Sequence, residues 1–214
     1  MRLHPDGWPY IAIAVALNAL LFAVAGWFGW LLVPVTLWCI AFFRDPERHV
    51  PAGDGLIVSP ADGVMLPVIE AVPPEELGMG DGKLRRLSIF MNVFNVHVNR
   101  VPADGTVTAL AYRPGKFINA SFDKASEHNE RMAVRLRMNN GQDLAVVQIA
   151  GLVARRIRCD LLKEQVVRKG ERFGIIRFGS RLDVYVPEGA EIGVNKGERV
   201  KAGETVLATL NRKG

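Results

Sequence analysis

The chain contains 214 residues, a length that favours one compact domain with at most a small additional segment. Its two cysteines, Cys39 and Cys159, indicate neither a disulfide framework nor a metal site built from clustered cysteines. The net charge of +5 indicates an anionic partner. Because the sequence contains no nucleic-acid recognition motif, it favours a membrane surface over a nucleic acid.

The first predicted element is an apolar segment over residues 11–43, whose only polar side chains are Asn18 and Thr36. Signal peptides are shorter, so we interpret residues 1–43 as a retained membrane anchor. One long tilted helix would satisfy the requirement of roughly 20 apolar residues for a crossing. The sequence Gly26-Trp27-Phe28-Gly29 indicates instead a break that would produce a helical hairpin, and the sequence leaves both topologies open.

Arg44 and Arg48 follow the apolar segment directly. Because basic residues next to a membrane segment tend to stay in the cytoplasm, we expect the remaining domain, residues 44–214, on the cytoplasmic side of the cell membrane.

Residues 44–214 alternate between turn-forming Pro, Asn, Asp and Gly and short apolar runs, which is typical of a β-rich domain. The sequence predicts strands at Leu87–Phe90, Val93–Val98, Ala133–Met138, Leu144–Ile149, Phe173–Phe178, Leu182–Val186 and Thr205–Leu210. One short helix is expected around Ala120–Asn129.

The C-terminal residues 186–210 resemble half of a lipoyl/biotinyl-like barrel, with glycines at tight turns between brief strands. We therefore predict a mainly β, barrel-sandwich-hybrid (lipoyl/biotinyl-like) domain with an N-terminal hydrophobic helical anchor. The same pattern leaves an alternative function open, a carrier with a modified Lys196 or a membrane-tethered binding module without catalysis. The Met-Lys-Met signature of biotin carriers does not occur here.

Three short segments contain residues with catalytic potential. In an extended strand, His97 would share a face with Asn95 and Asn99, where an imidazole can act as a general base near neutral pH. Asp62 precedes Gly63 in a turn sequence and can orient an imidazole. A lone strand histidine and an Asp-Gly turn are nevertheless commonly structural, and neither motif is specific by itself.

The third segment is Gly179-Ser180. It lacks the second glycine of the hydrolase Gly-x-Ser-x-Gly elbow, because position 182 is Leu. Gly179 leaves its carbonyl sterically open and permits unusual backbone dihedrals. The hydroxyl of Ser180 can therefore approach that carbonyl, which is the local geometry that an intramolecular N→O acyl shift requires.

Five segments in this order resemble the short, membrane-attached type of the phosphatidylserine decarboxylase family. They are FFRDPER (42–48), SPADG (59–63), FMNVFNVHVNRVP (90–102), PGKFINASFDKASEHNER (114–131) and RFGSRLDVYVP (177–187). The Gly-Ser pair within RFGSR and the PGK…NER segment are the most specific parts of the resemblance.

The resemblance implies a proenzyme that cuts itself between Gly179 and Ser180 into residues 1–179 and 180–214, which stay together as a heterodimer. Ser180 would become a covalent pyruvoyl group, the only cofactor expected, with no metal. His97 would be the base and Asp62 its orienting partner. Long-type members often carry a second histidine where this chain has Phe94, which leaves the later proton donor open between His97 and water.

The implied reaction is the decarboxylation of phosphatidylserine to phosphatidylethanolamine through a Schiff base between the pyruvoyl ketone and the substrate amine. The expected partners are the phospholipid substrate, the membrane and the two fragments of the chain itself, with no nucleic acid. Acyl-chain preference and further oligomerisation are left open by the sequence.

Overall fold

The computed structural model describes residues 2–115, 129–151, 157–177 and 179–210. The chain divides into two compact units. The N-terminal unit comprises Met1–Glu47 and Phe94–Val96, and the larger unit comprises Arg48–Val93 and His97–Gly214.

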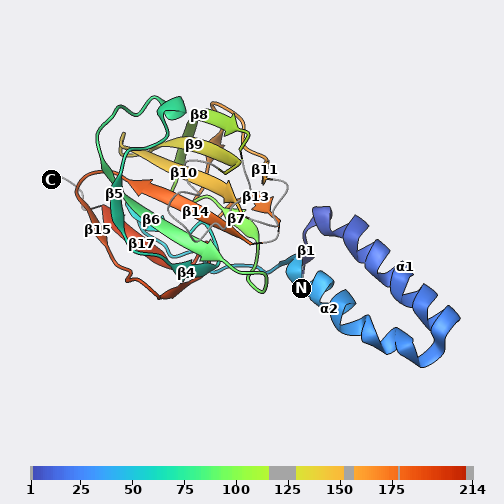
Figure 1. Cartoon of the computed structure of the whole chain (residues 1–214). Helices are drawn as coiled ribbons and strands as arrows, with labels where there is room; N and C mark the ends of the chain where they lie inside the picture. The colour runs from blue at the N-terminus through green and yellow to red at the C-terminus, as the bar shows by residue number, and fades with distance from the viewer. Residues whose placement is uncertain (1, 116–128, 152–156, 178, 211–214) are drawn as a thin grey trace. The chain divides into compact units, whose positions relative to one another are not determined.

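The N-terminal unit is a helical hairpin (Figure 1). Its elements are β1 (Arg2–Leu3), η1 (Pro5–Gly7), α1 (Trp8–Ala25), η2 (Gly26–Leu31), α2 (Val33–Phe42) and β2 (Arg44–Asp45). Helix α1 ends at Gly26, whose φ of +53° suits glycine, and this is where the sequence indicated a break. Strand β1 pairs with β2, so the two ends of the hairpin are held together.

The larger unit is built from three antiparallel sheets. The central sheet has the order β12-β8-β9-β10-β14-β6-β4-β16, with β5 also paired to β6. Its strands are β4 (Gly63–Met65), β5 (Ile69–Ala71), β6 (Leu84–Met91), β8 (Gly105–Arg113), β9 (Arg131–Met138), β10 (Asp143–Ala150), β12 (Val166–Val167), β14 (Ser180–Val186) and β16 (Arg199–Val200).

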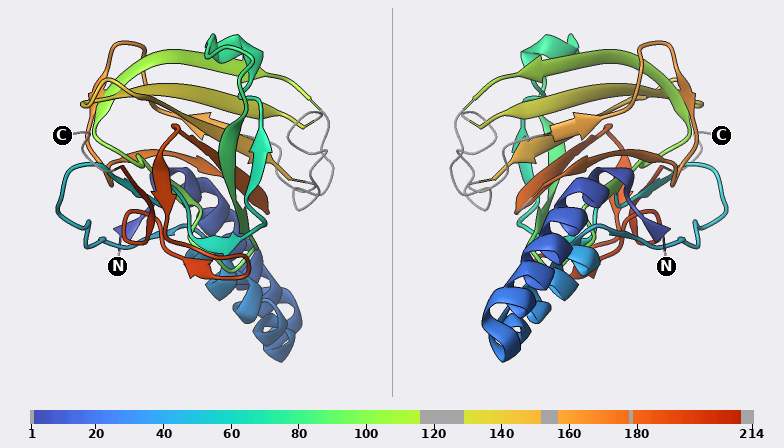
Figure 2. Two further views of the ribbon diagram at one scale, coloured as in Figure 1. Left: turned by 90° about the vertical axis from the view of Figure 1, so that its left-hand side faces the viewer. Right: turned by 90° about the vertical axis from the view of Figure 1, so that its right-hand side faces the viewer.

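Two small sheets complete this unit, with the orders β11-β13-β7 and β15-β17-β3. Their strands are β3 (Leu56–Val58), β7 (Val98–Arg100), β11 (Ile157–Cys159), β13 (Arg172–Ile176), β15 (Ala190–Ile192) and β17 (Val206–Leu210), and a short 3₁₀ helix, η3, spans Glu75–Leu77. Figure 2 shows the long central strands curving across the unit.

The central sheet separates two apolar clusters, because alternate residues of a strand point to opposite faces. Ile89, Leu182 and Val146 belong to the larger cluster, which also contains residues of the small sheets. Val147, Ile149 and Tyr185 belong to a smaller cluster that includes Leu77 of η3. Strand β14 therefore contributes side chains to both clusters and is buried along its whole length.

The prediction of a mainly β domain with an N-terminal apolar helical segment is confirmed. Within the described residues the strand order of the central sheet is an open path rather than a closed barrel. The brief C-terminal strands and their glycine turns occur as predicted, with positive φ at Gly189, Gly197 and Gly203.

One predicted strand is wrong. Residues 93–95 form a turn, and only Val98 of the predicted Val93–Val98 strand lies in a strand, as the first residue of β7. In this turn the backbone carbonyl of Phe94 accepts a 2.7 Å hydrogen bond from the side chain of Arg44, through Nη2. In a strand, the backbone of a neighbouring strand would be the usual donor to this carbonyl. The helix expected around Ala120–Asn129 lies, apart from Asn129, outside the described residues.

Candidate active site

Ser180 is the first residue of β14 and lies in the middle of the central sheet. It is opposite Met91 of β6 on one side and Ala150 of β10 on the other. Its side chain is fully buried, and Oγ has no hydrogen-bond partner among the described residues. A buried hydroxyl without a partner costs free energy in a folded protein, so this orphaned group is typical of a residue retained for chemistry.

Gly179, which precedes the strand, has a φ of +69°, in the left-handed region that favours glycine. A Cβ at this position would meet no described atom within 4 Å, so the backbone conformation rather than crowding explains the glycine. The peptide bond between residues 179 and 180 therefore lies at a sharp entrance to a strand that is paired on both sides.

A buried amide pair lies on the same face of the sheet as Ser180. Gln148 is two residues before Ala150, the partner of Ser180, and alternate strand residues share a face. Its Nε2 donates to Oδ1 of Asn99 at 2.8 Å and to the carbonyl of Arg158 at 3.3 Å. Nδ2 of Asn99 lies 3.9 Å from Sδ of Met91, the other neighbour of Ser180.

His97 is fully buried and lies two residues before Asn99, at the entrance to β7. A solvent-facing position of His97 is thereby excluded, and Asn99, Gln148 and Ser180 are completely buried as well. The amide bridge from Asn99 to Gln148 joins the segment of His97 to the face of the sheet that carries Ser180.

Asp62 has well-defined partners of its own. Its carboxylate accepts two 2.8 Å hydrogen bonds from Nη2 of Arg48 and one of 2.8 Å from the backbone N–H of Ala202. The structure thus pairs Asp62 with a guanidinium group rather than with an imidazole. Its expected role in orienting His97 stays a prediction.

The opposite face of β14 carries a buried charged pair. Arg181, next to Ser180, donates from Nε and Nη2 to the carboxylate of Asp183 at 2.6 and 2.7 Å. Nε of Arg86 lies 3.7 Å from the same carboxylate. Burial and the negative charge of Asp183 raise the pKa of the neighbouring Tyr185. This two-point contact between alternate positions of one strand rigidifies the segment that begins at Ser180.

Asn129, Asn99 and Gln148 are site residues that the sequence reasoning did not select. Nδ2 of Asn129 donates to the carbonyl of Ala150 at 2.7 Å, and the N–H of Ala150 donates to the carbonyl of Glu130 at 3.0 Å. These bonds fix the strand end opposite Ser180. Asn99 and Asn129 fall in the segments that carry the family resemblance, which was the available signal for them.

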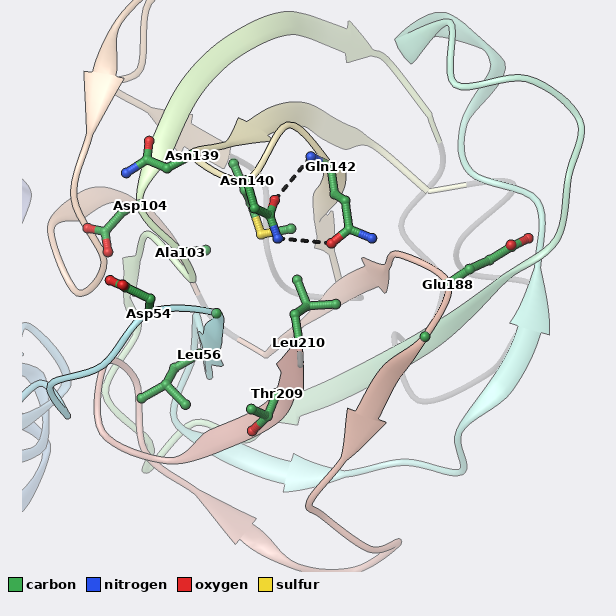
Figure 3. A pocket seen from close by; sticks show the side chains of 13 residues that line it. Asp54, Leu56, Ala103, Asp104, Asn139, Asn140, Gln142, Glu188, Thr209 and Leu210 are labelled. Carbon is green, nitrogen blue, oxygen red and sulfur yellow. Dashed lines mark hydrogen bonds between the residues drawn. The ribbon is translucent and has the colours of Figure 1, made fainter. Parts of the chain in front are cut away.

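A large surface cavity lies elsewhere in this unit (Figure 3). It has a volume of about 1190 Å³ and is lined mainly by loop residues such as Asp54, Asp104, Asn140 and Glu188. Ser180, His97 and Asp62 are not among its lining residues. The cavity therefore does not bring together the three residues that the sequence predicts to be catalytic.

Comparison with known proteins identifies the family of the chain. The family model described as phosphatidylserine decarboxylase matches residues 35–208. The chain is 56% identical over 208 residues to the phosphatidylserine decarboxylase proenzyme of Ruegeria pomeroyi, covering 97% of this chain and 95% of the relative. It is 57% identical over 208 residues to the proenzyme of Cereibacter sphaeroides, covering 97% and 90% of the two chains. The proenzyme of Paramagnetospirillum magneticum is 54% identical over 210 residues, with 98% and 87% coverage. The chain therefore belongs to the phosphatidylserine decarboxylase family.

Proposed function

We propose that this chain is a proenzyme that cuts itself between Gly179 and Ser180 and then decarboxylates phosphatidylserine to phosphatidylethanolamine. The observation that carries the proposal is the buried Oγ of Ser180, which has no hydrogen-bond partner among the described residues and directly follows a glycine of positive φ. Membership of the family and the proenzyme names of the relatives support the same conclusion.

The cut begins with attack of Ser180 Oγ on the carbonyl carbon of Gly179. The C–N bond of the peptide breaks as an ester bond to Oγ forms, and the freed amine takes the hydroxyl proton through a base. Loss of the Cα proton of residue 180 then breaks its Cβ–Oγ bond, leaving a carboxylate on Gly179 and dehydroalanine at residue 180. Addition of water and loss of ammonia convert the dehydroalanine into a pyruvoyl group.

We assign the base to His97, whose imidazole is buried in the segment joined to the Ser180 face through Asn99 and Gln148. A neutral imidazole is a suitable proton acceptor near neutral pH. Asp62 is proposed as its orienting carboxylate on the strength of the family resemblance, although Arg48 and Ala202 occupy its hydrogen-bonding oxygens here.

The described residues suit a pyruvoyl group at position 180. No described atom lies within 4 Å of a Cβ built on Gly179. The strand that starts at residue 180 is held by β6 and β10, so the new chain end would stay in place after the cut. Such a group supplies a ketone that condenses with the substrate amine and accepts electrons as carbon dioxide leaves. The two fragments, residues 1–179 and 180–214, would remain associated through the sheet.

The N-terminal hairpin fits a substrate that stays in a bilayer. The helical stretch Pro5–Leu31 is long and apolar enough to cross a membrane. Arg44, directly after the apolar segment, favours a cytoplasmic location for the catalytic unit by the positive-inside tendency.

The test compares the wild-type chain with Ser180→Ala and with Ser88→Ala, a matched variant of another buried serine on the neighbouring strand β6. We expect intact-mass measurement to give two fragments for wild type and Ser88→Ala, and one uncut chain for Ser180→Ala. Only the forms that are cut should release carbon dioxide from phosphatidylserine micelles. An uncut wild-type chain with full activity would refute the proposal.

His97→Ala is expected to slow or abolish the cut, with His49→Ala as the control, because His49 lies in an exposed segment outside the site. Normal processing of His97→Ala would remove that residue from the role of base.

A further inference from the structure

The hairpin of the N-terminal unit is closed along its whole length by contacts between its two arms. Near the tip, Nδ2 of Asn18 donates to the carbonyl of Gly29 at 2.8 Å. Further along, Oγ1 of Thr36 donates to the carbonyl of Ala14 at 3.5 Å. At the open end the rings of Tyr10 and Phe43 stack with centroids 5.5 Å apart. The second arm therefore returns along the full length of α1.

The only polar side chains of the apolar segment are thus used within the hairpin. Asn18 bonds to the carbonyl of Gly29 near the tip, and the one hydroxyl proton of Thr36 is shared between the carbonyl of Ala14 on the opposite arm, at 3.5 Å, and that of Leu32, at 3.1 Å. In hydrocarbon a polar side chain must find an internal partner, because no water is available. Apolar side chains such as Ile13, Leu17, Leu20 and Val24 are exposed outward. A helix that is apolar on all sides and exposed requires an apolar solvent.

The length of the hairpin matches the thickness of a bilayer rather than one leaflet. Helix α1 has 18 residues, which at 1.5 Å per residue gives about 27 Å. The hydrocarbon core of a bilayer is about 30 Å thick, so a hairpin of this depth reaches across both leaflets.

Aromatic side chains lie at both ends of the hairpin. Trp8 and Tyr10 mark the open end, beside the charged Arg2, Asp6 and Arg44. Trp27, Phe28 and Trp30 form the closed tip, and all three are exposed. The middle of α1 contains neither Trp nor Tyr. Tryptophan and tyrosine concentrate at the two water interfaces of a membrane, where their rings are at headgroup level.

We propose that the hairpin traverses the whole hydrocarbon layer, with Trp27 and Trp30 in the interface of the leaflet opposite the one that Trp8 and Tyr10 occupy. The tip would then reach the far headgroups without carrying a charge across. This inference defines the depth of the membrane attachment that the proposed function invokes, but it depends on the N-terminal unit alone. It would hold even if the chain had no decarboxylase activity.

The sequence offers a direct measurement, because all four tryptophans, Trp8, Trp27, Trp30 and Trp38, lie in the hairpin. Three single-tryptophan forms of the full chain would be placed in phosphatidylethanolamine–phosphatidylglycerol vesicles, with the remaining tryptophans replaced by Phe. One retains Trp8, one retains Trp27, and one carries Leu17→Trp at an exposed position midway along α1. Lipids brominated near the headgroup or near the chain end then quench each tryptophan according to its depth.

We expect a shallow–deep–shallow pattern, in which the Leu17→Trp form is quenched most by chain-end bromine and the Trp8 and Trp27 forms by bromine near the headgroup. If chain-end bromine quenches Trp27 more than the other two tryptophans, the hairpin stops at the bilayer centre. If bromine near the headgroup quenches all three tryptophans most, the hairpin lies along the surface. Either result overturns the proposal. Far-UV circular dichroism of each form in the same vesicles verifies that the helices are retained.

Discussion

Gln148 donates a 2.8 Å hydrogen bond to Oδ1 of Asn99, and this bond joins the central sheet to β7 beside the face that carries Ser180. The two residues are 49 positions apart in the sequence and both are fully buried. A buried amide left without its hydrogen-bond partner destabilises the fold. The bond therefore constrains where β7, and with it His97, can lie.

Gln148→Ala is expected to slow self-cutting by at least about tenfold, since a shift in the nucleophile–base geometry of roughly 1 Å can cost a hundredfold in rate. It also leaves Asn99 Oδ1 without its donor, at a cost of about 1–3 kcal/mol in unfolding free energy. The measurement is the fraction cut against time on denaturing gels, with Gln142→Ala, in the exposed β9–β10 turn, as the control.

The double variant Gln148→Ala/Asn99→Ala separates positioning from stability. Removal of both partners leaves no orphaned group, so part of the lost stability should return while the cut stays slow. Wild-type cutting rates in Gln148→Ala would show that the amide bridge has no role in processing.

Gly179→Ala tests whether the left-handed backbone at the scissile bond matters. Gly179 and Gly189 have φ of +69° and +79°, and neither would meet a described atom within 4 Å if a Cβ were added. Each alanine variant should therefore lose roughly 1 kcal/mol of stability through backbone strain alone. Only Gly179→Ala is expected to change the rate of the cut, and equal rates in both variants would contradict this interpretation.

Local chemistry explains which parts of this site could be predicted from the sequence. The Gly179-Ser180 pair is recognisable because both reacting groups are adjacent in the chain, and most strands are recognisable by their alternating or apolar runs. The spacing of residues 93–98 predicts a strand because apolar residues alternate with Asn95 and His97 there, whereas the chain turns at residues 93–95. The pairs Gln148–Asn99 and Asp62–Arg48 depend on strand order, which residue spacing does not encode.

The pH dependence of stability should have a contribution from Glu76, in the short helix η3. Partial burial opposes its ionisation, but hydrogen bonds at 2.7 and 3.0 Å from Arg131, with the charges of Arg131 and Arg113, outweigh that effect and lower the pKa of Glu76. A lowered native pKa stabilises the fold above the unfolded pKa of about 4.3. This stabilisation is lost as the pH falls through the native value.

The melting temperature of the wild type should therefore fall more steeply than that of Glu76→Gln as the pH drops from roughly 5 to 3. Glu75→Gln, an exposed neighbour without a described ion pair, is the control and should follow the wild type. Parallel curves for all three proteins would exclude a contribution from Glu76.

Asp183→Ala is expected to destabilise the chain severely. Arg181 and Asp183 are almost completely buried, and removal of the carboxylate leaves the guanidinium of Arg181 in an apolar interior with a weakened set of partners. Breaking a buried pair in this way costs about 3–5 kcal/mol. Asp143→Ala breaks the more exposed ion pairs with Arg135 and Arg137 and should cost clearly less, about 1 kcal/mol for each pair at most. Urea unfolding of both variants in an uncut Ser180→Ala background provides the comparison, and equal losses would contradict the difference expected from burial.

Arg48 and Asp62 provide a test of the role expected for Asp62, because its carboxylate is bonded to Arg48 and to the N–H of Ala202. If Asp62 acts by orienting His97 during processing, Asp62→Asn should slow the cut strongly, whereas Arg48→Met should leave the cutting rate within a few fold of wild type. If Asp62 only anchors the segment that contains Arg48, the two variants should lose similar stability and be cut at similar rates. Cutting time courses and melting temperatures of both variants, measured side by side, distinguish the two cases. We expect the first result, since an aspartate orients a histidine by fixing its tautomer, a function that an asparagine of the same shape cannot supply.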